Sequence, residues 1–304
     1  MKKLLVLAGI LFVSLGASPG VAKVKIVATT NTLAALARAV GGDDVSVESL
    51  TKGSRDPHFA AAKPSMIRKI YRADLLLSVG ADLEIAWLPA ALRAGRNPRV
   101  QPGQPGFLDL SAAVNLLEVP TGPVTRAMGD VHVKGNPHYL LDPRNGVRAA
   151  AAMASRLETI DPDKADRYRA RIAEFRAAID GKVADWDRRT ASLKGKSVIA
   201  HHKTFSYLAD AFGFEVVDYV EPLPGISPTA AHLSHVANRI TEQKIGLLII
   251  ALYYNQRPAH YLAEATGINV VPLPQAVEST PDIKTYFDLF DRIVDALSQA
   301  RGGQ

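Results

Sequence analysis

Three histidines occupy short polar loops, in the sequences SRDPHF, GNPHYLLDP and VIAHHKTF, and they are His58, His138 and His202. A neutral imidazole nitrogen is the commonest protein ligand for zinc, and three of them leave one tetrahedral position for a carboxylate, an amide or water. The sequence has no HExxH pattern and no cysteine, which excludes the spacings of zincins and zinc fingers. Spacing alone therefore does not establish a metal site, because each histidine taken singly also fits a surface or capping role.

Short apolar segments alternate with amphipathic ones over most of the chain. Strands are predicted at 23–28, 45–50, 74–79, 197–200, 215–219, 246–252 and 269–272. Helices are predicted at 31–40, 65–72, 205–212, 229–243 and 258–266, with a last helix capped by Thr280 and carrying Pro281 at its first position. Alternation of this kind predicts parallel sheets covered by helices.

Residues 162–191 interrupt the alternation with one long helical pattern. Its apolar positions are three or four apart: Tyr168, Ile172, Phe175, Ile179, Val183 and Trp186. Asp161 is the expected N-cap, with Pro162 in the first turn. We therefore predict an α/β protein of two lobes, each with a mostly parallel sheet flanked by helices, at 23–161 and 193–304, joined by one long helix at 162–192.

This architecture gives the histidines a common location. In open α/β sheets, ligands bind at the carboxyl ends of the strands. His58 follows the strand at 45–50, and His202 follows the strand at 197–200. The two lobes are therefore expected to supply histidines to one cleft.

The first residues have the pattern of a cleaved export signal. Lys2 and Lys3 precede an apolar run at 4–15 and small residues that end at Ala22. We predict a signal peptide at 1–22 and a periplasmic mature protein, since the apolar run is shorter than the roughly 20 residues of a membrane-spanning helix. Without cysteine, neither disulfides nor a lipid-modified cysteine is expected.

The charge balance gives no sign of a nucleic-acid partner. Removal of 1–22 takes away two Lys and no acid, so 36 basic and 30 acidic residues become 34 and 30, a balance of +4. The basic residues are scattered among acids and lack accompanying stacking aromatics, so no nucleic acid is expected to bind.

Three segments together resemble the signature regions of the metal-specific solute-binding proteins of ABC transporters, the cluster that takes up zinc and manganese. They are DPHFAAAKPS at 56–65, NPHYLLDP at 136–143 and HHKTFSYLADAFGF at 201–214. The resemblance runs from about residue 24 to the end of the chain and includes the long central helix. It implies a protein that holds a metal ion between its lobes and passes it to a membrane permease.

The resemblance also implies the ligands. In that family the histidines of the first two segments, here His58 and His138, bind the metal, together with the residue before an x-x-aromatic-x-Tyr pattern, here His202. His201 is the competing candidate, and only one of the pair is expected to reach the metal because neighbouring side chains at a strand end point apart. In manganese-type members this third position resembles a Glu, so a histidine there favours zinc.

The chain departs from the family pattern at the fourth ligand. An Asp is expected after the strand near 268–272, but the sequence there is VVPLPQAVEST, with Gln275 close to that place. An amide oxygen is neutral and binds zinc more weakly. Three residues are candidates for the fourth position: Gln275, the neighbouring Glu278, and His132, six residues before His138. Water is a further alternative, and His132 also fits a solvated loop.

The other polar residues receive simpler interpretations. His232 and His235, three apart on a predicted helix, and His260 on another are expected to bind no metal. Asp56 and Asp142 lie near ligand histidines and are candidates for accepting the second ring N–H, although Asp before Pro is also a turn or helix-start signal.

The expected function is therefore periplasmic capture of Zn²⁺ as cargo and its delivery to an ABC-transporter permease by a monomer that is not an enzyme. Segment 118–133 holds one histidine, so the extended His-rich loop of many zinc-uptake members is absent. Manganese and ferrous iron are the alternative cargoes. A zinc hydrolase is disfavoured because no motif places a general base, while a metallochaperone or adhesin on this scaffold stays open. Affinity should fall as the pH drops through roughly 6–7, where imidazoles protonate.

Overall fold

The computed structural model describes residues 22–125 and 132–300 of the 304-residue chain. The predicted signal peptide thus lies outside the described residues, apart from Ala22. Within the described ranges, no helix combines the length and the apolar character needed to cross a bilayer.

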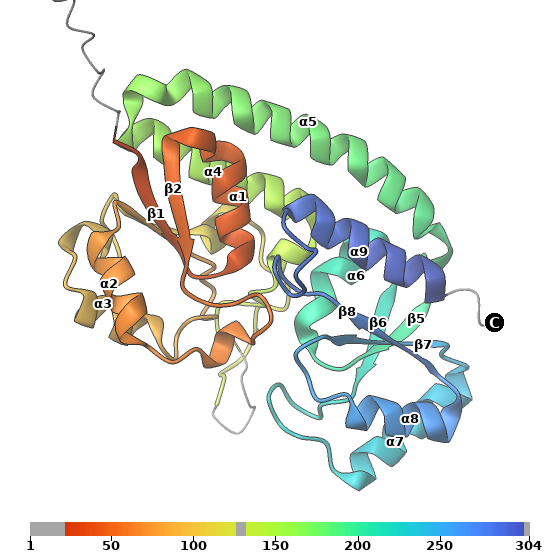
Figure 1. The fold of residues 1–304 in the computed structure, drawn as a ribbon. Coiled ribbons are helices and arrows are strands. Elements are labelled where there is room, and N and C mark those ends of the chain that lie inside the picture. Colours follow the sequence, from red (N-terminus) through yellow and green to blue (C-terminus); the bar gives the residue numbers. More distant parts are fainter. Residues whose placement is uncertain (1–21, 126–131, 301–304) are drawn as a thin grey trace, which may run out of the picture.

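The N-terminal lobe is built on a parallel four-stranded sheet. Its strands are β1 (Val24–Ala28), β2 (Val45–Ser49), β3 (Leu75–Ser78) and β4 (Phe107–Asp109), in the order β2-β1-β3-β4. Its helices are α1 (Asn31–Gly41), α2 (Pro64–Arg72), α3 (Leu88–Gly95) and α4 (Pro143–Ile160). Figure 1 shows α2 and α3 on one face of the sheet and α1 and α4 on the other. The central strand LLLS of β3 is wholly buried, as expected where helices cover both faces.

The C-terminal lobe repeats this plan. Its strands are β5 (Ser197–Ala200), β6 (Glu215–Tyr219), β7 (Leu247–Ala251) and β8 (Asn269–Leu273), again parallel and in the order β6-β5-β7-β8. Its helices are α6 (Ser206–Phe212), α7 (Ala230–Gln243), α8 (Arg257–Thr266) and α9 (Tyr286–Gln299). The predicted fold class, two lobes with parallel sheets flanked by helices, is confirmed.

The long helix, α5 (Ala165–Arg189), runs over both lobes (Figure 1). It begins later than predicted, because Pro162–Lys164 form a 3₁₀ turn before it. Asp161 does not cap this turn through its side chain. Its carboxylate instead accepts hydrogen bonds from Lys164 Nζ at 2.8 Å and from the Tyr168 hydroxyl at 2.9 Å.

The predicted start of the last helix was wrong. Helix α9 begins at Tyr286, and its N-cap is Thr285 instead of Thr280. Thr285 and Asp288 form a reciprocal capping box, which satisfies two backbone N–H groups that the first turn leaves without partners. The Thr-Pro pair at 280–281 lies in the turn that precedes the helix.

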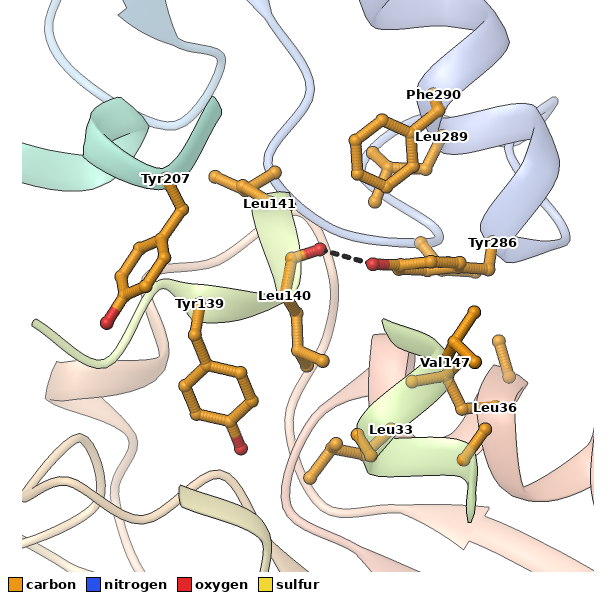
Figure 2. Close-up of a cluster of buried hydrophobic side chains, with 14 of the residues drawn as sticks. Leu33, Leu36, Tyr139, Leu140, Leu141, Val147, Tyr207, Tyr286, Leu289 and Phe290 are labelled. Atoms are coloured by element: carbon orange, nitrogen blue, oxygen red, sulfur yellow. Dashed lines mark hydrogen bonds between the residues drawn. The ribbon is translucent and has the colours of Figure 1, made fainter. Parts of the chain in front are cut away.

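One apolar core extends through both lobes and fixes how they meet. Side chains of α1 and α4 in the first lobe pack with those of α5, α6 and α9. At the centre, the Tyr286 hydroxyl of α9 donates to the Leu140 carbonyl at 2.6 Å and approaches the Asp142 carbonyl at 3.1 Å (Figure 2). The Tyr286 ring lies against Gly146, where a Cβ would come within 2.3 Å of it. The lobes are therefore joined by packing as well as by the chain.

This contact can be tested with Tyr286→Phe. Loss of the buried hydroxyl leaves a carbonyl pair without its donor, so the free energy of unfolding in urea should fall by about 1–2 kcal/mol. Tyr261→Phe is the control, because Tyr261 is 48% exposed and its change should stay within about 0.5 kcal/mol. Equal effects of the two changes would show that the Tyr286 hydroxyl does not stabilise the lobe contact.

Candidate metal centre

The three predicted histidines lie at the carboxyl ends of the strands. His58 lies in a 3₁₀ turn (Pro57–Phe59) after β2, where the Asp56 carboxylate accepts its backbone N–H at 2.9 Å. His138 precedes the 3₁₀ turn Tyr139–Leu141, and its backbone N–H donates to Asn136 Oδ1 at 2.9 Å. His202 follows β5 after one residue. Local turn chemistry thus fixes the backbone at His58 and His138.

Asn136 ties the segment of His138 to the opposite lobe. Its side-chain amide donates to the Lys203 carbonyl at 2.8 Å, and its own carbonyl accepts from the Tyr207 hydroxyl at 2.7 Å. Since Lys203 adjoins His202, these bonds hold the loop of the N-terminal lobe against the loop that carries the histidine of the C-terminal lobe.

The imidazole rings gather into one cluster. The ring centroid of His58 lies 5.3 Å from that of His138, 6.3 Å from that of His202 and 5.1 Å from that of His132. His138 and His202 are 5.9 Å apart. The structure therefore brings the three predicted histidines together and adds His132, one of the three fourth-ligand candidates.

Carboxylates hold two of these rings by one nitrogen. His58 Nδ1 lies 2.6 Å from Asp56 Oδ1, and His202 Nδ1 lies 2.8 Å from Glu221 Oε2. In neutral imidazole only one nitrogen carries hydrogen, so an Nδ1–H donated to a carboxylate leaves the Nε2 lone pair available. Asp56 thus accepts the second ring N–H of His58, the role for which it was a candidate.

The other two rings differ from these. His138 Nε2 is buried without a hydrogen-bond partner among the described residues. His132 Nε2 lies 3.1 Å from His58 Nε2. Two nitrogen ligands of one tetrahedral zinc ion, with bonds of about 2.0–2.1 Å, are roughly 3.3 Å apart. The observed spacing of these two nitrogens is therefore close to that of a shared metal ion.

Among residues 22–125 and 132–300, no three or more His, Cys, Asp or Glu side chains are arranged so that they could hold a metal ion together. The Nε2 atoms of His58 and His132 are in hydrogen-bond contact. A metal ion bound by both rings would have to displace that bond, and His132 would then carry its proton on Nδ1.

His201 and Glu221 lie next to His202 in the C-terminal lobe. The His201 ring stacks on Tyr254, with centroids 4.6 Å apart, and its Nε2 lies 3.5 Å from Glu221 Oε1. Both rings approach Glu221 and Tyr254, but of the two only His202 lies next to His58 and His138. Glu221 was not predicted, although it follows β6 and the strand-end rule that located His202 would have found it.

The remaining fourth-ligand candidates lie in contacts between the lobes. Gln275 Nε2 donates to the Gly53 carbonyl at 2.9 Å, and its Oε1 is buried without a hydrogen bond in the described residues, beside a cavity shared with His138. The Glu278 carboxylate accepts from the Asn31 amide. Both side chains are thus already engaged across the interface.

The other histidines lie away from the cluster. His232 Nε2–H donates to the Tyr219 carbonyl at 3.0 Å, and His235 is exposed, 3.8 Å from Asp218. Asp142 is not an outer partner of a histidine in this structure, since its carboxylate caps α4 by accepting from Arg144 N.

The surroundings lower the pKa of two histidines of the cluster and that of Glu221. Burial, together with the nearby His58, lowers the pKa of His132 to about 4 and that of His138 well below its ordinary value. Burial raises the pKa of Glu221, but hydrogen bonds from His201 and His202 outweigh it and hold that pKa at about 2. Neutral His132 and His138 are in the protonation state that metal coordination requires.

The sequence profile of the family described as zinc-uptake complex component A, periplasmic, matches residues 26–300. The zinc-binding lipoprotein AdcA of Streptococcus pneumoniae is 23% identical over 91% of this chain, which spans 56% of that protein, or about half its length. The high-affinity zinc uptake protein ZnuA of Paracoccus denitrificans is 27% identical, covering 91% of this chain and 92% of the relative. The iron-binding protein YfeA of Yersinia pestis is 24% identical, covering 92% and 87%.

Solved structures show the same fold. A crystal structure of ZnuA superposes with a TM-score of 0.76 at 20% identity, covering 92% of this chain and 99% of that one. The three relatives are thus named for zinc binding, zinc uptake and iron binding.

The lowered pKa values predict how stability depends on pH. Histidine in an unfolded chain has a pKa of about 6.5. Below that pH the unfolded metal-free chain therefore binds protons that His132 and His138 do not bind in the folded protein. The free energy of unfolding should therefore fall as the pH drops from about 6.5 toward 4. In urea titrations His132→Gln should reduce this loss by on the order of 2 kcal/mol, whereas exposed His235→Gln should leave it unchanged. A loss that is identical in all three proteins would refute the neutral assignment of His132.

Proposed function

This chain belongs to the zinc-uptake component A family of periplasmic, metal-binding ABC-transporter proteins, and from that membership we propose that it captures Zn²⁺ between its lobes for a membrane permease. The observation that carries the proposal is the convergence of imidazole rings from both lobes at one point of the cleft. The leader pattern at 1–22 supports release into the periplasm. We retain the monomer as the expected state.

We propose His58, His138, His202 and His132 as the ligands. Support for the first three comes from their Nε2 atoms, two oriented by carboxylates and one buried without a partner among the described residues. Support for His132 comes from its 3.1 Å approach to His58 and its depressed pKa. Gln275 and Glu278 are weaker candidates because their side chains bond Gly53 and Asn31.

The ligand chemistry favours zinc over the other metals of the family. Four imidazoles offer no direct carboxylate oxygen, whereas manganese prefers oxygen ligands. Zinc accepts four nitrogens in a tetrahedron. Asp56 and Glu221 are hydrogen-bonded to the Nδ1 atoms of His58 and His202, and their negative charge offsets that of the ion. Ferrous iron is the nearest competitor, since imidazole also suits it.

Binding and release follow from the division of ligands. Three of the proposed four come from the N-terminal lobe, and only His202 comes from the other. A small separation of the lobes removes one ligand and its outer carboxylate, which weakens the site without dismantling it. Because the lobes share a continuous core, we expect a modest movement.

Single replacements test the core ligands. His58→Ala, His138→Ala and His202→Ala should each weaken zinc binding, in competition with a chromogenic chelator, by more than the 10–100-fold typical of losing an outer-shell partner. His235→Ala is the control and should bind as the parent does. Metal analysis of protein from periplasm should find zinc, and a preference for manganese in direct competition would overturn the choice of cargo.

The fourth ligand is decided by a second pair of variants. His132→Ala should reduce zinc affinity and lower the number of nitrogen neighbours in X-ray absorption from four to three, because one imidazole leaves the metal. Gln275→Ala should leave the nitrogen count unchanged. Three nitrogen neighbours in the parent protein, with affinity lost in Gln275→Ala and kept in His132→Ala, would assign the fourth position to the amide oxygen of Gln275.

Glu221 orients the only ligand of the C-terminal lobe. Glu221→Gln replaces an acceptor by an amide that also donates, so it no longer fixes the His202 tautomer, and zinc affinity should fall about 10–100-fold. Glu221→Asp should recover part of the loss. Unchanged affinity in Glu221→Gln would mean that His202 keeps its orientation without this carboxylate.

A further inference from the structure

The amino ends of the strands in the N-terminal lobe lie opposite the histidine cluster and carry a group of exposed cationic side chains. We call this group the basic end, and it consists of Lys23, Arg68, Arg72, Arg93 and Arg96, with exposed Tyr71 among them. None of these residues takes part in the metal centre.

Packing brings the carboxyl ends of α2 and α3 together. The Asn97 amide, just after α3, donates to the carbonyls of Ile70 at 2.9 Å and Ala73 at 2.8 Å at the end of α2. Gly95 lies against Ile70, where a Cβ would approach within 2.7 Å. Figure 1 shows the two helices side by side on the outer face of the lobe. The cations of the two helices therefore form one surface.

Helical spacing directs the cations of α2 to a common side, since Arg68 lies three residues before exposed Tyr71 and four before Arg72. Arg93 lies in the last turn of α3, and Arg96 is the residue that ends this helix in a left-handed conformation.

The positive charge is not offset locally. Neither α2 nor α3 contains Asp or Glu. The nearby acids are taken by other cations, Asp74 by Arg99 at 3.1 Å and Glu48 by Lys69 at 3.0 Å. Within the described ranges, no carboxylate lies within ion-pair distance of the five cations. Interaction with the helix dipoles explains a charge in the last turn of each helix, but not Lys23 or Arg68.

The entry of the chain lies at the same place. Lys23 precedes β1, and the Asp74 backbone N–H at the start of β3 donates to Lys25 at 2.8 Å, next to the end of α2. Ala22, Lys23, Asp74 and Arg99 line one cavity. The mature chain that the predicted cleavage after Ala22 would leave therefore begins at the basic end.

We propose that the basic end docks on the anionic phospholipid headgroups of a membrane surface. Guanidinium groups pair with phosphate oxygens through two parallel hydrogen bonds, and an exposed tyrosine ring suits the headgroup layer. An acidic protein would fit the charge as well, but bidentate pairing of guanidinium groups with phosphate and the exposed Tyr71 ring favour a bilayer. The metal centre faces away from this surface, so docking does not depend on zinc and stands apart from the proposed function.

The test is co-sedimentation of the protein purified from periplasm with phosphatidylglycerol-containing vesicles and with pure phosphatidylcholine vesicles. We expect binding to the anionic vesicles only, at about 0.01 M salt, and its loss near 1 M, where the Debye length shrinks from roughly 30 Å to 3 Å. Metal-free and zinc-loaded protein should bind equally. Absence of binding at low salt, or equal binding to both vesicles, overturns the proposal, and the former leaves an acidic protein as the partner.

Matched variants locate the surface. Replacement of Arg68, Arg72, Arg93 and Arg96 by Gln should reduce the partition onto anionic vesicles by at least about tenfold. The control replaces four exposed arginines of α5, Arg167, Arg169, Arg176 and Arg188, by Gln, with the same loss of charge and little expected effect. An equal reduction in both variants would show that net charge, and not the basic end, determines binding. Zinc titration of each variant verifies the fold.

Discussion

The packing between the two lobes is the constraint on which the rest of the structure depends. His58 and His202 follow strands of different sheets, and the centroids of their rings lie 6.3 Å apart. No local interaction along the chain accounts for this approach. That approach is set by the core shared by α1, α4 and α9 and by the Tyr286 hydroxyl on the Leu140 carbonyl. Leu140 lies two residues after His138, so the contact that joins the lobes also fixes a histidine loop.

Electrostatics then decides what the cluster can bind. His132 and His138 resist protonation, because burial disfavours the charged form and the neighbouring histidines add repulsion. Asp56 and Glu221 lie at the outer side of the His58 and His202 rings, where their carboxylates orient them.

Much of the fold was accessible from sequence because burial leaves a periodic pattern. Seven of the eight strands, the long helix and the placing of His58 and His202 follow from apolar runs and strand-end geometry. Strand β4 was missed because it has only three residues. Helices α3 and α4 were also missed, although α4 is as amphipathic as the predicted α1. The cap at Thr285 was missed because Thr280-Pro281 offers an equally good local signal. The place of His132 depends on how a loop folds back, which no local pattern encodes.

The two sheets have the same strand order, but the loops that follow corresponding strands carry different residues. Corresponding second strands, β2 and β6, lead to His58 in one lobe and to Glu221 in the other. Corresponding first strands, β1 and β5, lead to threonines in one and to the pair His201-His202 in the other. The polar residues thus lie in loops, while the strands and helices that pack the lobes are apolar. A loop can therefore change its polar residue without disturbing the lobe packing, and the relatives similar to this chain are named for zinc and for iron.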